Sequence, residues 1–324
     1  MVSDVIVVGA GVLGLAAGAE LRCRGRKVRV LAPAEVSASA LAAGMLAPAF
    51  ESVLDPRAAA HADLLRRARD LWPSFAAVTG VALIRDGAEW RGPDPENMAD
   101  RLAAAGFATR ETPQGVMTPD DWRLDPVQAL AALVRPLDRV HGRLIAVEGR
   151  DGAFVLTTDE GESLQARQIV LASGWQALDC GLPLPPIRPI KGQALRVAGP
   201  SPERVLRGEG VYVVPAPGGA IIGATMGEGA ADTQIDPEVS DRLIGRARAI
   251  WPQASEMTRA QAFAGVRGAC PDDLPAVGLI APGVAVALGP RRNGWLLAPM
   301  IAAIAASALE GEGRPGPFDP GRFA

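Results

Sequence analysis

The stretch DVIVVGAGVLG, Asp4–Gly14, decides the fold that the sequence predicts. The four residues Val5–Val8 are all β-branched, which is typical of a buried parallel strand. Gly9, Gly11 and Gly14 then follow in the pattern G-x-G-x-x-G. In this pattern the first glycine allows a tight turn, the second lets the backbone approach a pyrophosphate, and the third lets the next helix pack closely on the strand. The stretch therefore predicts a dinucleotide site, with a merely structural tight turn as the alternative.

Two further elements complete a β-α-β unit around this turn. Val12–Arg24 has a helical pattern, and Lys27–Leu31 is expected to form the second strand. The pyrophosphate would lie at the helix N-terminus, where the first amides lack partners. An acidic residue that binds the adenosine ribose is expected at the end of the second strand, but the chain has Ala32-Pro33 there and Glu35 comes three residues late. We expect a loosely held dinucleotide, the alternative being that Glu35 or a nearby serine takes over the ribose.

Length and composition bound the class of protein. A chain of 324 residues suggests two domains or one large α/β unit with a cap, and a hydrophobic content of 48% is ample for a packed core. The net charge of -3 gives no reason to expect nucleic acid or a membrane as partner. No charge-free apolar stretch is long enough to span a bilayer, and the sequence starts without a signal-peptide pattern. We therefore expect a cytoplasmic protein.

Cysteine and histidine are scarce. Cys23, Cys180 and Cys270 are far apart, match no metal-binding spacing, and are odd in number, which argues against a disulfide framework. Because His61 and His141 are the only histidines in the sequence, we expect no metal site.

The rest of the chain alternates between helical and strand patterns. Helices are expected at 57–78, 97–106, 126–137 with Asp125 as N-cap, 237–251, and after the turn Arg292-Asn293-Gly294. The segment 37–46 reads as a helical turn of small residues that a flat ligand could approach. Strands are expected at 168–172, 210–215, 220–225, 265–268, 275–280 and 284–288, with a hairpin at 143–158 that turns at Asp151-Gly152.

These patterns predict an α/β fold with two domains. A Rossmann-like dinucleotide-binding domain would comprise residues 1–80, 120–186 and 262–324. An inserted substrate domain of α+β character, built on an antiparallel sheet, would comprise residues 81–119 and 187–261.

Eight short segments, in this order along the chain, resemble the flavin-dependent glycine oxidase branch of the D-amino-acid oxidase family. That branch is often tied to thiazole formation in thiamine synthesis. The segments are Gly9–Gly14, Ala42–Leu46, Leu171–Trp175, Pro189–Gln193, Tyr212–Pro215, Gly223–Met226, Ala264–Arg267 and Arg292–Gly294.

The resemblance implies a non-covalent FAD and a set of site residues. Tyr212 and Arg267 would clamp the substrate carboxylate, Arg292 would be a second basic residue at the site, and Met226, with Met45, would form apolar walls. The residues implied to bind the cofactor are Gly9, Gly11, Gly14, Ala43, Gly44, Met45, Ser173, Gly174, Asn293, Gly294, Trp295 and Leu296.

Some of these roles have independent support in the residues. Arg267 lies between glycines on an apolar strand, so it should pair with an anion, either a substrate carboxylate or Asp272 or Asp273. Tyr212 is the only tyrosine, and its hydroxyl needs a polar partner whether it lies in a site or in the core. The N-terminus of the helix after Gly294 could face the flavin's pyrimidine ring, where reduction places negative charge.

The predicted function is oxidative deamination of a small amino acid, such as glycine, sarcosine or a small D-amino acid. The products would be the 2-oxo acid, ammonia and hydrogen peroxide, with dioxygen as electron acceptor. One alternative is a D-amino-acid dehydrogenase of the same fold that uses another acceptor. Another is a non-catalytic FAD-binding protein, which Ala32 and Pro290 favour because the family has an acid and a histidine there. The oligomeric state stays open, with a homo-oligomer among the options.

Overall fold

The glycine-rich stretch forms the centre of the first sheet of the protein. The structure is a computed structural model that describes residues 2–150, 152–176, 178–312 and 316–324. Five parallel strands run in the order β8-β2-β1-β11-β19. Their bounds are β1 (Val2–Val8), β2 (Val28–Ala32), β8 (Asp138–His141), β11 (Ser163–Leu171) and β19 (Val284–Leu288). The predicted parallel α/β unit is confirmed, and β8 is a strand that the sequence patterns did not reveal.

Antiparallel strands join this sheet at its β19 edge and along the first half of β11. β18 (Ala276–Ala281) pairs with β19, while β9 (Leu144–Arg150) and β10 (Ala153–Thr158) form a hairpin that joins β11. The predicted hairpin is thus confirmed, although Asp151 of its turn lies outside the described residues.

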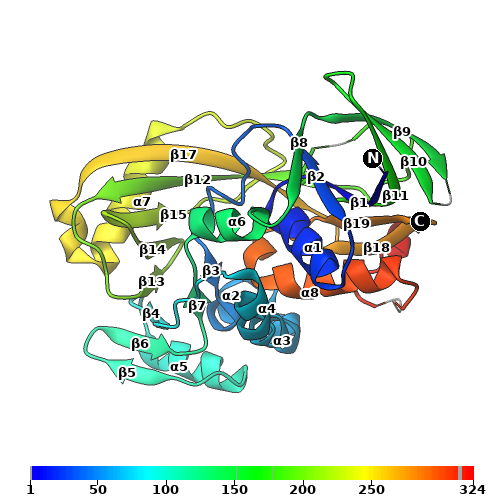
Figure 1. Cartoon of the computed structure of the whole chain (residues 1–324). Helices are drawn as coiled ribbons and strands as arrows, with labels where there is room; N and C mark the ends of the chain where they lie inside the picture. Colours follow the sequence, from blue (N-terminus) through cyan, green and yellow to red (C-terminus); the bar gives the residue numbers. More distant parts are fainter. Residues whose placement is uncertain (1, 151, 177, 313–315) are drawn as a thin grey trace.

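Both faces of β1 are covered, as the run of β-branched residues predicts. Val5 and Val7 pack with α1 (Val12–Cys23) and α8 (Gly294–Leu309) in one core. Ile6 and Val8 point to the opposite face and pack in a second core with residues of the β9–β10 hairpin. Figure 1 shows α1 and α8 side by side against the first sheet.

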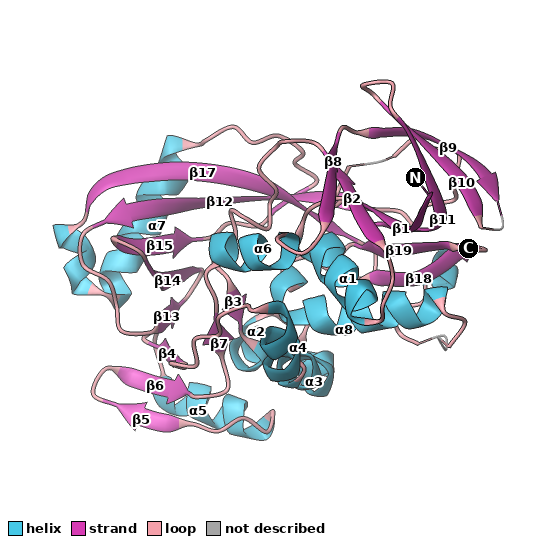
Figure 2. Ribbon diagram, viewed as in Figure 1, coloured by secondary structure: helices cyan, strands magenta, loops and turns pink. Residues whose placement is uncertain are grey.

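A second sheet forms the other half of the molecule, and Figure 2 shows its long strands β12 and β17 running toward the first sheet. The strand order is β16-β12-β15-β14-β13-β4-β6-β5, and β17 pairs with the free edge of β12. The sheet is antiparallel as predicted, except that β13 and β4 pair in parallel. The bounds are β4 (Ala88–Trp90), β5 (Arg110–Thr112), β6 (Gly115–Thr118), β12 (Arg188–Ala198), β13 (Val205–Gly208), β14 (Val211–Ala216), β15 (Gly219–Gly223), β16 (Gly227–Glu228) and β17 (Thr258–Ala269).

The strand β17 is much longer than the predicted 265–268. It pairs with β12 along nearly its whole length and crosses the predicted domain limit at residue 261. The exact limits of the two domains remain a prediction.

The two faces of the second sheet carry different partners. Helix α7 (Pro237–Ile250) covers one face. The other face packs against α2 (Pro48–Leu54) and α5 (Pro95–Ala104), and Tyr212 lies at the margin of this core. The predicted site residue Tyr212 therefore lies on the α2 side of the sheet.

Two helical predictions need correction. The expected helix at 57–78 is divided into η1 (Ala59–His61), α3 (Ala62–Asp70) and α4 (Trp72–Thr79). Pro73 stands in the first turn of α4, where a proline is favourable, whereas inside one continuous helix it would remove a hydrogen bond and clash with the preceding turn.

The expected helical turn at 37–46 ends early. A turn at residues 38–41 is followed by β3 (Met45–Leu46), which pairs with β7 (Trp122–Arg123). Gly44 has φ +72°, and a side chain there would collide with the carbonyl oxygen of Leu124, so the backbone leaves the helical path at this point.

Other helices form close to where they are expected. Helix α6 (Pro126–Val134) begins at the predicted cap, since Asp125 accepts hydrogen bonds from the amides of Val127 at 2.9 Å and Gln128 at 3.0 Å. Two short 3-10 elements complete the fold, η2 (Pro252–Glu256) and η3 (Pro320–Phe323). In the described residues, no helix has the length and apolar character needed to cross a membrane.

Candidate active site

The structural requirements for the first and third glycines of the loop are visible in its backbone. Gly9 has φ +116°, and a Cβ on it would collide with the carbonyl of Ala172 at the end of β11. A Cβ on Gly14 would collide with the carbonyl oxygen of Gly9. Helix α1 therefore packs on β1 as closely as the third glycine of the motif allows.

The N-terminus of α1 is open to a ligand. Gly11 is the N-cap and supplies no side chain, and the amide of Val12 donates to Ser39 Oγ at 3.0 Å. The next amides of the first turn have no carbonyl partner within the helix, as at any helix start. This cradle of glycines and backbone amides fits a pyrophosphate.

Ser173 and Gly174 lie beside this cradle, directly after Ala172. Ser173 Oγ donates to the carbonyl of Gln176 at 3.2 Å, and Gly174, at φ +77°, faces open space. Neither residue lines the pocket described next.

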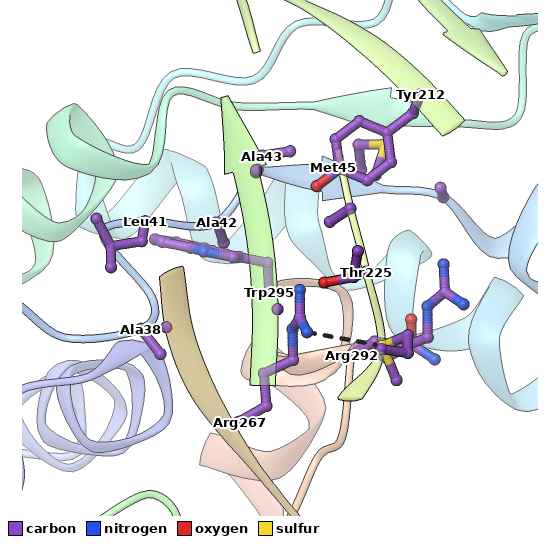
Figure 3. A pocket seen from close by; sticks show the side chains of 18 of the residues that line it. Ala38, Leu41, Ala42, Ala43, Met45, Tyr212, Thr225, Arg267, Arg292 and Trp295 are labelled. Atoms are coloured by element: carbon purple, nitrogen blue, oxygen red, sulfur yellow. Dashed lines mark hydrogen bonds between the residues drawn. The ribbon is translucent and has the colours of Figure 1, made fainter. Parts of the chain in front are cut away.

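A pocket lies between the α2 face of the second sheet and the segment that precedes α2 (Figure 3). It brings together nine residues that the sequence singled out, namely Ala43, Gly44, Met45, Tyr212, Met226, Arg267, Arg292, Asn293 and Trp295. Gly294 lies between this pocket and the glycine loop, because a Cβ on it would lie 3.6 Å from Val12 Cγ1. The side chain of Leu296 is buried in the main core instead.

The floor of the pocket follows the two-residue period of β-strands. Phe263, Gly265 and Arg267 alternate along β17 and all line the pocket. Gly192 and Ala194 face them from β12, in register with Gly265 and Phe263. Of these five residues only Arg267 was predicted as a site residue, although Gly192 and Gly265 lie in segments that carry the family resemblance and the alternation along the strand indicates Gly265 and Phe263.

The guanidinium of Arg267 points into the cavity (Figure 3). Its Nη1 lies 3.6 Å from the sulfur of Met226, and none of the ion pairs among the described residues involves Arg267. Burial lowers the pKa of Arg267, and the positive charge of Arg292 lowers it further. Arg267 is therefore a desolvated cation that faces the pocket without an acidic partner in the described chain.

The two aspartates considered as internal partners of Arg267 are used elsewhere. Asp272 pairs with Arg322 at 2.7 Å. Asp273 pairs with Arg57 at 2.9 Å and also with Arg188. The alternative of an internal ion pair for Arg267 is thus not what the structure shows.

Tyr212 presents its hydroxyl to the same cavity from β14 (Figure 3). Its ring lies across Gly223 on β15, where a Cβ would collide with the phenol oxygen. Burial raises the pKa of Tyr212, which keeps the hydroxyl protonated and able to donate a hydrogen bond.

Arg292 differs from Arg267 because it has acidic partners. Its Nε lies 2.8 Å from Glu51 Oε2, and its Nη2 donates to Glu51 Oε1 at 3.1 Å. Its Nη1 lies 3.8 Å from Asp55 Oδ2. The charge of Glu51 is the main reason that the pKa of Arg292 is raised.

Glu51 is a pocket residue that the sequence analysis missed. It lies on α2, whose N-terminus is held by Asp121 through hydrogen bonds from the amides of Ala49 at 2.7 Å and Phe50 at 3.2 Å. Glu51 is only 4% exposed, and it also accepts a hydrogen bond from Arg207 Nη2 at 3.1 Å. The signal in the sequence that could have indicated this residue is a glutamate within the largely apolar segment 45–53.

Comparison with known proteins identifies the family to which the chain belongs. The profile of the family described as FAD dependent oxidoreductase (DAO) matches residues 4–308. The chain is 33% identical to the bifunctional protein ThiO/ThiG of Trichormus variabilis, over 95% of this chain and 53% of that protein. It is 31% identical to the D-amino-acid oxidase of Rubrobacter xylanophilus, over 84% of each chain. It thus spans about half the length of the ThiO/ThiG relatives.

Solved structures show the same fold. The crystal structure of glycine oxidase from Geobacillus kaustophilus superposes with a TM-score of 0.82 at 26% identity, covering 99% of this chain and 98% of that one. The glycine cradle at the start of α1 agrees with this match, because it has the shape that a dinucleotide requires. The chain belongs to the DAO family of FAD-dependent oxidoreductases, and its cofactor is FAD.

Proposed function

We propose that the protein catalyses the oxidative deamination of a small amino acid, with glycine, sarcosine and small D-amino acids as the candidate substrates. The observation that carries the proposal is the guanidinium of Arg267, which faces the same pocket as the hydroxyl of Tyr212 and has no acidic partner in the described chain. The names of the relatives, D-amino-acid oxidase and glycine oxidase, support the same reaction class.

Arg267 and Tyr212 would hold the substrate carboxylate. The planar guanidinium can donate two parallel hydrogen bonds to a carboxylate, and the phenol can donate a third. Because Arg267 is partly buried, such a pair is stronger than the same pair on the surface.

Apolar side chains would limit the size of the substrate. Met226, Phe263 and Ala194 line the cavity around the predicted carboxylate clamp. When bound, FAD supplies a hydride acceptor for the substrate Cα–H bond. The lining contains no histidine, so we expect these residues to contribute positioning and electrostatic stabilisation rather than proton abstraction.

We propose that FAD extends from the glycine loop to the pocket. Gly9, Gly11 and Gly14 would hold the pyrophosphate, with Ser173 and Gly174 beside them. The small segment Ala43–Met45 and the start of α8 at Asn293–Leu296 would hold the flavin. At Leu296 the backbone amide would serve, because the side chain is in the core. The positive end of α8 suits the negative charge of a reduced flavin.

We further propose that the reaction serves thiazole formation for thiamine. Similarity to two proteins with ThiO in their names favours this role, together with the glycine-oxidase motifs of the sequence.

One set of measurements tests the proposal. The purified protein should be yellow, and acid precipitation should release the chromophore into the supernatant, because Cys180 and Cys270 are buried outside the pocket and Cys23 is remote from it. Under anaerobic conditions the flavin absorbance should bleach on addition of glycine, sarcosine, D-alanine or D-proline, and air should then restore it with release of peroxide.

Each rival function gives a different result in the same experiment. Anaerobic bleaching without peroxide on re-aeration would indicate a dehydrogenase with another acceptor. Bound FAD that none of the four amino acids reduces would contradict the proposal and favour a non-catalytic FAD-binding protein.

A further inference from the structure

The two arginines that line the pocket carry the same charge but differ in their acidic partners. Arg267 has no acidic partner among the described residues, whereas Arg292 contacts two carboxylates, Glu51 and Asp55. Glu51 is shared further, since Arg207 also donates to it. The pocket therefore contains two guanidinium groups but only one that is available to a ligand.

The contacts of Arg292 leave little room for a second ligand carboxylate. Glu51 occupies the edge of the guanidinium formed by Nε and Nη2, with atom separations of 2.8 and 3.1 Å, and Asp55 Oδ2 lies 3.8 Å from the remaining nitrogen, Nη1. A ligand anion that approached Arg292 would compete for this edge and would lie next to the buried charge of Glu51. Like charges in a desolvated site repel strongly, and such repulsion is an effective source of selectivity.

We infer that Glu51 restricts the pocket to ligands that carry a single carboxylate, by neutralising Arg292 and leaving Arg267 as the one anion-binding group. The inference rests on the proposed function, because it concerns the substrate class of the same site. Amino acids with a second carboxylate would be excluded by charge, not by size. Removal of the Glu51 charge would release Arg292 to bind that second carboxylate.

A purely structural role of Glu51 makes a different prediction. If the glutamate only fixed the orientation of Arg292, its loss would weaken the binding of all ligands by a similar factor. A selectivity role changes the ratio between a dianion and a monoanion that share the same three-carbon chain. Malonate and monomethyl malonate are such a pair, and neither can be oxidised as an amino acid.

The experiment is a titration of the FAD-bound enzyme with each ligand, followed through the visible spectrum of the flavin. The wild type is expected to bind monomethyl malonate at least about tenfold more tightly than malonate. In Glu51→Gln the ratio is expected to shift toward malonate by about tenfold or more. Glu89→Gln is the matched control, because Glu89 is equally buried and pairs with Arg91 but lies outside the pocket.

The outcomes separate this inference from the proposed function. Malonate binding to the wild type as tightly as its monomethyl ester would overturn the inference, even where Glu51→Gln fails to fold, and would leave the amino-acid reaction untouched. An unchanged ratio in a folded Glu51→Gln variant would overturn it as well. Failure of both ligands to bind, with no reduction of the flavin by any amino acid, would overturn the proposed function along with it.

Discussion

The guanidinium of Arg267 lies over the α-carbon of Gly192 on the neighbouring strand. A Cβ on Gly192 would fall too close to Nη1, Nη2 and Cζ of the arginine for any real contact. Gly265 is the register partner of Gly192, but a Cβ on it would approach Leu41 and Ala38 instead of the arginine. The position of the cation thus depends on a missing side chain one strand away.

We predict that Gly192→Ala impairs substrate binding more than stability. The atoms in the way are the end of a flexible side chain, so the arginine can move aside, but its guanidinium then leaves the position that faces the pocket. A misplacement of about 1 Å can lower kcat/KM by about a hundredfold. Steady-state kinetics with the best amino acid would measure this loss. Gly245→Ala is the control, because a Cβ on that exposed helix residue meets nothing. Wild-type kinetics in Gly192→Ala would contradict the assigned clamp.

Replacing the clamp residues themselves should give graded effects. Arg267→Ala is expected to weaken substrate binding by several kcal/mol, because it removes the cation of a buried charge pair. Tyr212→Phe removes one hydrogen bond to a charged group and should cost about 1–2 kcal/mol. Substrate KM, checked against the FAD content of each preparation, distinguishes these losses from unfolding. Arg248→Ala, an exposed change on α7, serves as control. Normal glycine kinetics in Arg267→Ala would show that the carboxylate binds elsewhere.

Asp121, which holds the N-terminus of α2, predicts a pH dependence of stability. Burial raises the pKa of this carboxyl group from an ordinary value of 3.8 to about 7, although hydrogen bonds from Ala49 and Phe50 oppose the shift. Between pH 3.8 and about 7, Asp121 of the folded protein keeps the proton that the same carboxyl group has lost in the unfolded chain. The free energy of unfolding should therefore fall as pH rises through this window, by up to about 1.4 kcal/mol per pH unit.

The variant Asp121→Asn tests this dependence, because an amide does not titrate. Between pH 5 and 8, its thermal midpoint should lie furthest below that of the wild type at pH 5, and the gap should narrow as pH rises to about 7. Asp236→Asn changes a comparable N-cap residue at the exposed start of α7 and serves as control. A gap in midpoint that stays constant from pH 5 to 8 would refute the role assigned to Asp121.

The parts of the site that could be predicted from sequence are those that local chemistry determines. The glycine loop is one example, since Gly9 and Gly14 are required by a turn and a close approach within six residues of each other. Arg267 is another, because a cation on an apolar strand needs an anion wherever the strand lies. Glu51 could not be assigned in this way. Its partners Arg207 and Arg292 are 156 and 241 residues away, and only the packing of α2 against the second sheet brings them together.

Errors in the predicted elements have similarly local causes. The strand β17 was underestimated because its first residues, Thr258–Gln261, are largely polar and gave no apolar strand pattern. The helix at 57–78 was overestimated because the apolar spacing continues through Leu71, although Pro73 starts a new helix there. The strand β8 is short, with two exposed charged residues at its start, and its place beside β2 follows only from the assembled sheet.

The end of β2 gives the last prediction, which concerns the affinity for FAD. Ala32 occupies the position where an acid would accept hydrogen bonds from the adenosine ribose, and Glu35 instead forms an ion pair with Arg143 on the protein surface. Ser37 and Ser39 accept hydrogen bonds from the amides of Ala40 and Val12, which fix the two hydroxyls near the start of α1. The nearby acid Glu35 is thus paired elsewhere, which favours a loosely bound cofactor.

Titration of the apoprotein with FAD, followed by the change in flavin fluorescence, measures this directly. Ala32→Glu is expected to tighten binding by about tenfold to a hundredfold, the equivalent of roughly 1.5–3 kcal/mol for a hydrogen bond to a charged acceptor. Glu35→Ala is expected to leave the affinity unchanged, since it removes only an exposed ion pair. Equal affinities for Ala32→Glu and the wild type, together with weaker binding by Glu35→Ala, would show that Glu35 leaves Arg143 to bind the ribose when FAD is present.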